Sequence, residues 1–126
     1  MTENAITKSL EDYIETIYLL SKNKSGVRVS DIAAKLKVAK SSVHTALHSL
    51  SDKDYIKHEK YGTVYLTEQG LRTAEQIYAR HIQLKAFFES ILGLDPETAE
   101  NDACAAEHVL SAAAVKAMTE FVNKNF

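Results

Sequence analysis

The 126-residue chain has 45% hydrophobic and 25% charged residues, a balance typical of a globular protein and not of a disordered one. Its single cysteine excludes an internal disulfide and favours a reducing cytoplasm, and its first residues lack the apolar stretch of a signal peptide. No apolar run is long enough to span a bilayer, so we expect no membrane partner. The net charge is −2, yet residues 22–60 carry nine basic and four acidic side chains. This basic middle segment keeps nucleic acid among the expected partners, because phosphate attraction is local.

The first half of the chain predicts helices from its apolar spacing. Residues 9–22 have this spacing behind Ser9, a residue type that caps helices, and residues 27–29 are a short strand candidate. Ser30 is expected to cap a helix over residues 31–38, and the spacing returns over residues 41–53 after a break. Two short helices separated by about four residues predict a helix-turn-helix.

The second half predicts a hairpin followed by three helices. Residues 55–67 alternate in character around Tyr61 and Gly62, which indicates a β-hairpin. Thr67 is expected to cap a long helix to about residue 92, Pro96 to open a helix through Val109, and Ser111 to cap a last helix. The predicted fold is mainly α, with a winged helix-turn-helix over residues 1–72 and a helical domain over residues 73–126.

A helix, a helix-turn-helix and a hairpin, in this order, are typical of a winged-helix DNA-binding domain. The second helix of such a motif places its N-terminal residues against base edges in the major groove. For any single polar residue, a solvated surface role is the commoner alternative, but the whole pattern on a basic segment favours DNA. The candidate DNA-binding residues are Arg28, Lys40, Ser41, Ser42, His44, Thr45, His48, Lys57, Lys60 and Tyr61, with His58 beside them on the wing.

The stretch "DACAAEH", residues 102–108, indicates a possible metal site. On a helix, Cys104, Glu107 and His108 stand at i, i+3 and i+4, so they are expected on one face. Asp12 and Glu15 form a second i, i+3 pair, and His81 lies within the long predicted helix. Each residue also has an ordinary explanation, as surface carboxylate, core histidine or small hydrophobe. Spacing alone leaves a regulatory site, a catalytic site and chance open.

The chain resembles, over nearly its whole length, the metal-dependent transcriptional regulators typified by the diphtheria toxin repressor and the manganese transport regulator. The stretches that carry the resemblance are "SLEDYIETIYLL", "VRVSDIAAKL", "SSV", "HEKYGTVYLTEQG", "ARHIQLKAFF", "LGLD" and "DACAAEHVLS". The resemblance implies a helical metal-binding and dimerisation domain after the wing. It also implies six metal ligands: Asp12, Glu15, His81, Cys104, Glu107 and His108.

The chain departs from both types within this family. Asp12 matches the manganese type, where the iron type has methionine, whereas Cys104 matches the iron type, where the manganese type has glutamate. Lys85 stands where an acidic residue commonly contributes to an ancillary site. In the reader helix, Lys40 replaces a common proline and His44 a common threonine. The mixed ligand set leaves Mn²⁺ and Fe²⁺ both open, with Zn²⁺ or Co²⁺ possible in vitro.

The expected protein is a cytoplasmic homodimer that binds a double-stranded, pseudo-palindromic operator and represses metal-uptake genes, with no organic cofactor. The uptake genes come from the resemblance alone; the dimer also follows from the apolar surface of "AFFESILGL" and "VKAMTEFV", which so few residues cannot cover. A second hypothesis is a winged-helix regulator of another signal, with no functional metal site. A third, a helical metalloenzyme, is disfavoured because no general base, phosphate loop or substrate cleft can be assigned.

Overall fold

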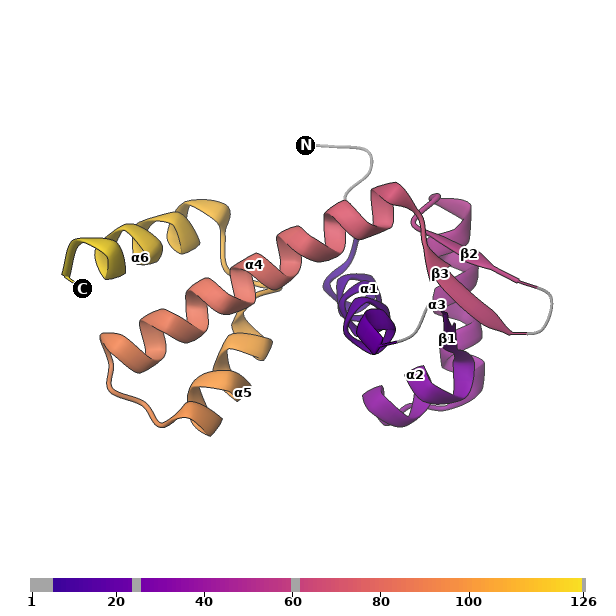
Figure 1. Ribbon diagram of the computed structural model, residues 1–126, viewed down its shortest axis with the longest axis horizontal. Helices are drawn as coiled ribbons and strands as arrows, with labels where there is room; N and C mark the ends of the chain where they lie inside the picture. The colour runs from indigo at the N-terminus through magenta and orange to yellow at the C-terminus, as the bar shows by residue number, and fades with distance from the viewer. Residues whose placement is uncertain (1–5, 24–25, 60–61, 126) are drawn as a thin grey trace. The chain divides into compact units, whose positions relative to one another are not determined.

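The structure, a computed structural model, describes residues 6–23, 26–59 and 62–125 (Figure 1). It divides into two compact units, residues 1–75 and 76–126. The boundary between the two units lies inside one continuous helix, α4 (Glu68–Ser90). The domain boundary expected after residue 72 therefore remains a prediction, and each unit is described here by itself.

Helix α1 (Lys8–Leu20) opens the first unit and is followed by a short 3-10 turn, η1 (Ser21–Asn23). Its N-cap is Thr7, whose hydroxyl accepts a hydrogen bond from the Leu10 N–H at 3.1 Å. The expectation that Ser9 caps this helix is therefore wrong, because the cap lies two residues earlier and Ser9 is helical. Ile14 and Ile17 are fully buried and fix the helix to the core of the unit.

Helices α2 (Val29–Leu36) and α3 (Lys40–Asp52) form the predicted helix-turn-helix. Helix α2 begins one residue before Ser30, at Val29, and the Arg28 N–H donates to the Asp31 carboxylate at 3.4 Å, so the expected Ser30 cap is wrong. The helix ends at Leu36, and its C-cap residue Lys37, with a φ of 58° and a ψ of 47°, turns the chain. This left-handed residue places α3 against α2 with few connecting residues.

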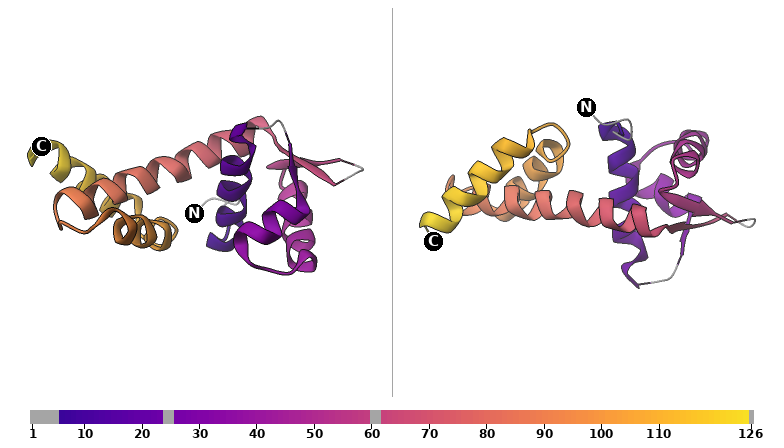
Figure 2. Two further views of the ribbon diagram at one scale, coloured as in Figure 1. Left: turned by 60° about the horizontal axis from the view of Figure 1, so that its bottom comes forward. Right: turned by 90° about the horizontal axis from the view of Figure 1, so that it is seen from above.

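A small antiparallel sheet completes the first unit. Its strands are β1 (Val27–Arg28), β2 (Ile56–His58) and β3 (Thr63–Leu66), and β3 lies in the centre. Val27 is opposite Val64 on one side of β3, and His58 is opposite the same residue on the other. The predicted hairpin is confirmed, and the strand candidate at 27–29 adds a third strand to it; Figure 2 shows the hairpin projecting beyond the helices of this unit.

Two glycines and a threonine shape the ends of this hairpin. Gly62 has a φ of +85°, a conformation that favours glycine, whereas its neighbour Tyr61 in the expected turn lies outside the described residues.

At the other end of the hairpin, Thr67 accepts a hydrogen bond from the Gly70 N–H at 3.1 Å and donates to the Asp54 carbonyl at 2.7 Å. A Cβ on Gly70 would lie 2.0 Å from the Tyr55 carbonyl oxygen, so this close approach needs glycine. The prediction that Thr67 caps α4 is confirmed.

The second unit packs the rest of α4 with α5 (Pro96–Ala106) and α6 (Ala112–Asn125). Its core is formed by Leu84, Ala103 and Val115, with Phe88, Ala106 and Met118 packed against them. Asp95 caps α5 by accepting from the Thr98 N–H at 3.1 Å, and Ser111 caps α6 in the same way toward Ala114. None of the helices in the described parts of the chain combines the length and the hydropathy needed to cross a membrane.

Helix α5 ends earlier than expected. It was predicted to run through Val109, but it stops at Ala106, and the N–H groups of both Val109 and Leu110 turn back to the Ala106 carbonyl at 3.0 Å. Glu107 is the C-cap residue, so it and His108 lie at the end of the helix and not within it.

Candidate metal centre and DNA-binding surface

Helix α3 separates a buried face from an exposed polar face. Val43, Leu47 and Leu50 are fully buried and hold the helix to the first unit. The predicted DNA-reading residues of this helix are all exposed: Lys40, Ser41, Ser42, His44, Thr45 and His48. The Thr45 hydroxyl donates to the Ser41 carbonyl at 3.1 Å, and His48 lies 3.5 Å from the Asp52 carboxylate. A row of hydrogen-bonding groups at the start of an exposed helix can contact phosphates and base edges.

The strands add cationic and aromatic groups to this surface. Arg28 and Lys57 are exposed, and the His58 ring stacks on the His44 ring with centroids 6.1 Å apart. Arg28, Lys40 and His44 line one hollow together with Gly62. The predicted contacts Lys60 and Tyr61 lie outside the described residues. In the described part of the first unit, the predicted DNA-binding side chains therefore gather on α3 and the adjoining strands.

In the second unit, His81 lies between two carboxylates. This α4 residue is 4% exposed. Its Nδ1 lies 2.6 Å from Glu107 Oε1, and its Nε2 lies 2.9 Å from Glu100 Oε2. The ring also stacks on Tyr78 with centroids 6.0 Å apart. His81 thus joins α4 to both the middle and the end of α5.

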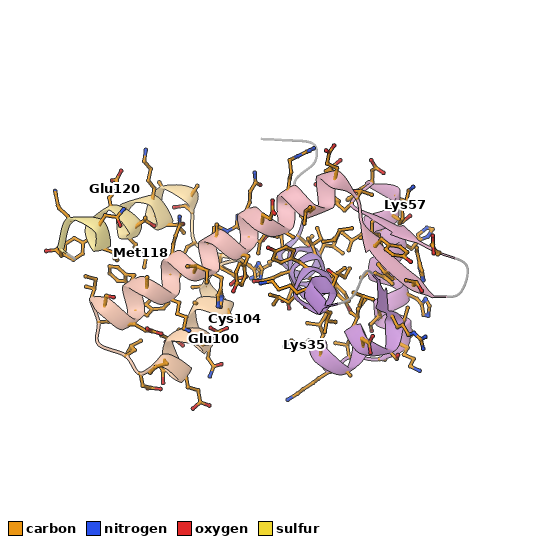
Figure 3. All side chains as sticks on the ribbon, in the orientation of Figure 1. Lys35, Lys57, Glu100, Cys104, Met118 and Glu120 are labelled. Carbon is orange, nitrogen blue, oxygen red and sulfur yellow. The ribbon has the colours of Figure 1, made fainter. Side chains whose placement is uncertain are left out.

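Glu100 is a residue of this cluster that sequence reasoning missed. One nitrogen of His81, one oxygen of Glu100 and the Cys104 sulfur lie within 4.8 Å of one another. Glu100 and Cys104 stand four residues apart on α5, and Figure 3 shows their side chains close together. The i, i+4 spacing from Cys104 could have found Glu100. Partial burial raises the pKa of Glu100, but the hydrogen bond and charge of His81, and then those of Lys85, outweigh it, so the pKa lies below its ordinary value.

Glu107 and His108 form the other side of the cluster. The Glu107 side chain is fully buried, and its Oε2 lies 3.3 Å from His108 Nε2. Its backbone carbonyl accepts a hydrogen bond from Arg80 Nε at 3.0 Å, which fixes the end of α5 to α4. Glu107 contacts Nδ1 of His81, and Cys104 lies with Glu100 near the same ring. The predicted convergence of Cys104, Glu107 and His108 on one face stays a prediction.

The other two predicted ligands belong to the first unit. Asp12 is exposed and Glu15 is buried, one turn apart on α1. The buried carboxylate of Glu15 is unusual, because glutamate is rarely buried unless it is paired. Both positions therefore stay candidates.

The residues around His81 fit a divalent metal ion. A neutral imidazole has one N–H, yet each nitrogen of His81 faces a carboxylate oxygen within hydrogen-bond distance. The single N–H of the ring can serve only one of these contacts, and a divalent ion at the other nitrogen would supply the positive charge that the second carboxylate faces. Imidazole nitrogen, thiolate sulfur and carboxylate oxygen are together a donor set for divalent transition metals.

A winged helix-turn-helix joined to a helical unit that gathers histidine, thiol and carboxylate groups defines a class of protein: DNA-binding regulators that respond to metal. Residues 5–64 match the family model "Iron dependent repressor, N-terminal DNA binding domain". Residues 67–125 match "Iron dependent repressor, metal binding and dimerisation domain". The chain belongs to this iron-dependent repressor family, and it is a metal-regulated DNA-binding transcription regulator and not an enzyme.

Individual relatives agree with the family. The chain is 34% identical to an uncharacterised HTH-type transcriptional regulator of Methanocaldococcus jannaschii over 94% of its own length and 96% of that protein. The structure is similar to the manganese regulator SloR, with a TM-score of 0.77, 26% identity, and coverage of 94% of this chain and 54% of that one. It also shares the fold of IdeR from T. acidophilum, with a TM-score of 0.81, 23% identity, and coverage of 94% and 55%. The chain thus spans about half the length of these two solved regulators.

Proposed function

We propose that this protein is a repressor of metal-uptake genes that Mn²⁺ or Fe²⁺ activates for operator binding. The observation that carries the proposal is the position of His81 between Glu100 and Glu107, with Cys104 and His108 beside these carboxylates, in the domain that matches a metal-binding family. His81, Cys104, Glu107 and His108 are the proposed ligands of the second unit, and Glu100 is a further candidate beside them. Asp12 and Glu15 join them on the family resemblance alone.

The choice between the two metals rests on the donor set. Carboxylates suit Mn²⁺, whereas a thiolate shifts preference toward Fe²⁺, Co²⁺ or Zn²⁺. The family description names iron, and the related regulator SloR is named for manganese. With one sulfur among several oxygen and nitrogen donors, we propose Fe²⁺ or Mn²⁺ as the physiological ion, ahead of Zn²⁺, which prefers four tetrahedral ligands.

The proposed DNA target is a pseudo-palindromic operator bound by a homodimer. Dimeric helix-turn-helix proteins read two half-sites about 34 Å apart, so their operators share the two-fold symmetry of the protein. The matched dimerisation domain and the exposed apolar side chains of the second unit, Ile82, Leu92, Val109 and Phe121, support a dimer. Lys40, Ser41, Ser42, His44, Thr45 and His48 would read the major groove, and Arg28, Lys57, Lys60 and Tyr61 would contact the backbone.

Metal would act by favouring the arrangement that binds DNA. A ligand shifts such an equilibrium only by its difference in affinity for the two states, and a coupling of about 1–3 kcal/mol is usual. Thiol and imidazole groups must lose protons to bind metal, so the metal response should weaken as pH falls.

The test is a titration of DNA affinity with Mn²⁺ and Fe²⁺ under anaerobic conditions, which keep Cys104 from oxidising. The probe is a duplex from the region upstream of the protein's own gene, and fluorescence anisotropy reports binding. Wild type is compared with Glu107→Ala and with Glu120→Ala, which removes an exposed carboxylate on α6. We expect metal to raise the affinity of wild type and Glu120→Ala, and not that of Glu107→Ala. Equal affinity of wild type with and without metal would refute the proposal.

A further inference from the structure

Lys85 brings a cation to the edge of the candidate metal centre. It follows His81 by one turn of α4, and its Nζ lies 3.5 Å from Glu100 Oε1 and 3.6 Å from Glu89 Oε2. Glu100 therefore uses one oxygen toward Lys85 and the other toward His81, whose Nε2 is 2.9 Å away. Glu100, which lies with His81 and Cys104 in this group, therefore already has the Lys85 ammonium as a partner.

An ammonium and a divalent ion compete for the same carboxylate. A metal ion bound by His81, Glu100 and Cys104 would add two positive charges a few ångströms from the Lys85 ammonium. Like charges this close repel one another, and the repulsion is reduced but not removed by solvent at side chains that are one-third to one-half exposed. Glu89, four residues further along α4, gives the ammonium a second carboxylate to which it can turn.

We infer that Lys85 sets the metal threshold of this regulator: its ammonium occupies Glu100 and weakens the binding of a divalent ion by the group of His81, Glu100 and Cys104. A metal ion must then displace Lys85 from Glu100, and the displaced ammonium keeps Glu89 as its partner. The inference rests on the proposed function and adds a residue that tunes it. The regulator responds at a higher metal concentration than the same ligands would give beside a neutral residue.

The test measures the affinity of the full-length protein for Co²⁺, whose thiolate charge-transfer absorption reports binding at Cys104. Lys85→Gln removes the charge and keeps a side chain of similar length, and we expect it to tighten Co²⁺ binding about tenfold. Lys116→Gln removes an exposed ammonium on α6 and is the matched control, with no expected change. Circular dichroism confirms that each variant is folded.

A double-mutant cycle with Glu100→Gln identifies the route of the effect. If Lys85 acts by occupying Glu100, Lys85→Gln improves affinity in the wild-type background and has little effect once Glu100 is neutral. Equal Co²⁺ affinity of wild type and Lys85→Gln would overturn the inference and leave the proposed function intact. If the wild type binds no Co²⁺ but Lys85→Gln binds it, the result supports the inference and counts against the proposed function. Absence of binding in both would overturn both.

Discussion

Glu107→Gln tests the candidate centre at its most buried carboxylate. The substitution keeps the shape of a side chain with no exposed surface but replaces a charged group by a neutral amide. Where the amide NH₂ takes the place of Oε1, the 2.6 Å contact with His81 loses its charged acceptor. A hydrogen bond to a charged group contributes about 1.5–3 kcal/mol, and relief of the buried charge offsets part of its loss.

We expect a net loss of about 1 kcal/mol in the metal-free protein, a small difference between those opposing contributions. The second unit, residues 76–126, can carry only a modest free energy of unfolding, about 2.5–7.5 kcal/mol at the usual value per residue. The metal-free variant should therefore stay folded but melt at a lower temperature. A variant that remains folded makes the metal response measurable.

The larger effect is expected with metal present. At a free concentration 100 times the dissociation constant, a ligand stabilises the native state by about 2.7 kcal/mol, which corresponds to about 10–20 °C in the melting temperature of a small domain. Loss of a group that merely orients a ligand costs about 10–100-fold in metal affinity, so we assign at least the upper value to a ligand itself. A 100-fold weaker site leaves about 0.4 kcal/mol of stabilisation, or about 2–3 °C.

The assay is thermal unfolding followed by circular dichroism, with and without Mn²⁺ at 100 times the dissociation constant of the wild type. Glu120→Gln, an exposed carboxylate on α6, is the control and should keep the full metal-induced shift (Figure 3). If Glu107→Gln also keeps that shift, Glu107 is not a ligand, and the reasoning from its burial and its two histidine contacts is wrong.

Three further predictions concern DNA affinity, the core and pH. Lys57→Gln should weaken binding to operator and random DNA alike and reduce the slope of log affinity against log salt by about 0.9, measured by anisotropy at several salt concentrations. Leu84→Ala, at a fully buried site, should cost about 2–5 kcal/mol, a large part of the stability of the second unit, and lower the midpoint of its urea titration. The hydrogen bond from the Thr98 hydroxyl, then that from its N–H, lowers the pKa of Asp95 below its ordinary 3.8. Its stabilising effect should therefore be present above pH 3.8 and lost as pH falls through the lower folded value, whereas Asp95→Asn should remove this acid-dependent step from urea midpoints.

The elements of the first unit could be predicted because each carries a local signal. Apolar periodicity placed α2 and α3, and alternation around Gly62 placed the hairpin. Helix starts were predicted less well, since Thr7 and Ser9 are both capping residue types and lie only two positions apart. Only the hydrogen bond from Leu10 to Thr7 separates them, and periodicity does not report such a bond.

The candidate site was harder to predict because its contacts are tertiary. Spacing predicted Cys104, Glu107 and His108 on one helical face, but it could not show that His81 of α4 lies beside Glu107 and beside the pair of Glu100 and Cys104. Glu100 was missed because an exposed glutamate on a helix is ordinary until a buried histidine from another helix lies 2.9 Å away. The geometry of a site built from two helices depends on their packing, which local sequence does not encode.

The two charged partners of Glu100 explain why the ligand set alone cannot set the metal affinity of this chain. His81 holds one oxygen of the carboxylate and Lys85 the other, so an ion that uses Glu100 must replace an interaction that already exists. Glu107, in contrast, is fully buried and contacts two histidines that can both become ligands. Loss of Glu107 should therefore abolish the metal response, whereas loss of Lys85 should strengthen it. These opposite signs, measured in one protein under one set of conditions, separate a ligand from a residue that opposes metal binding.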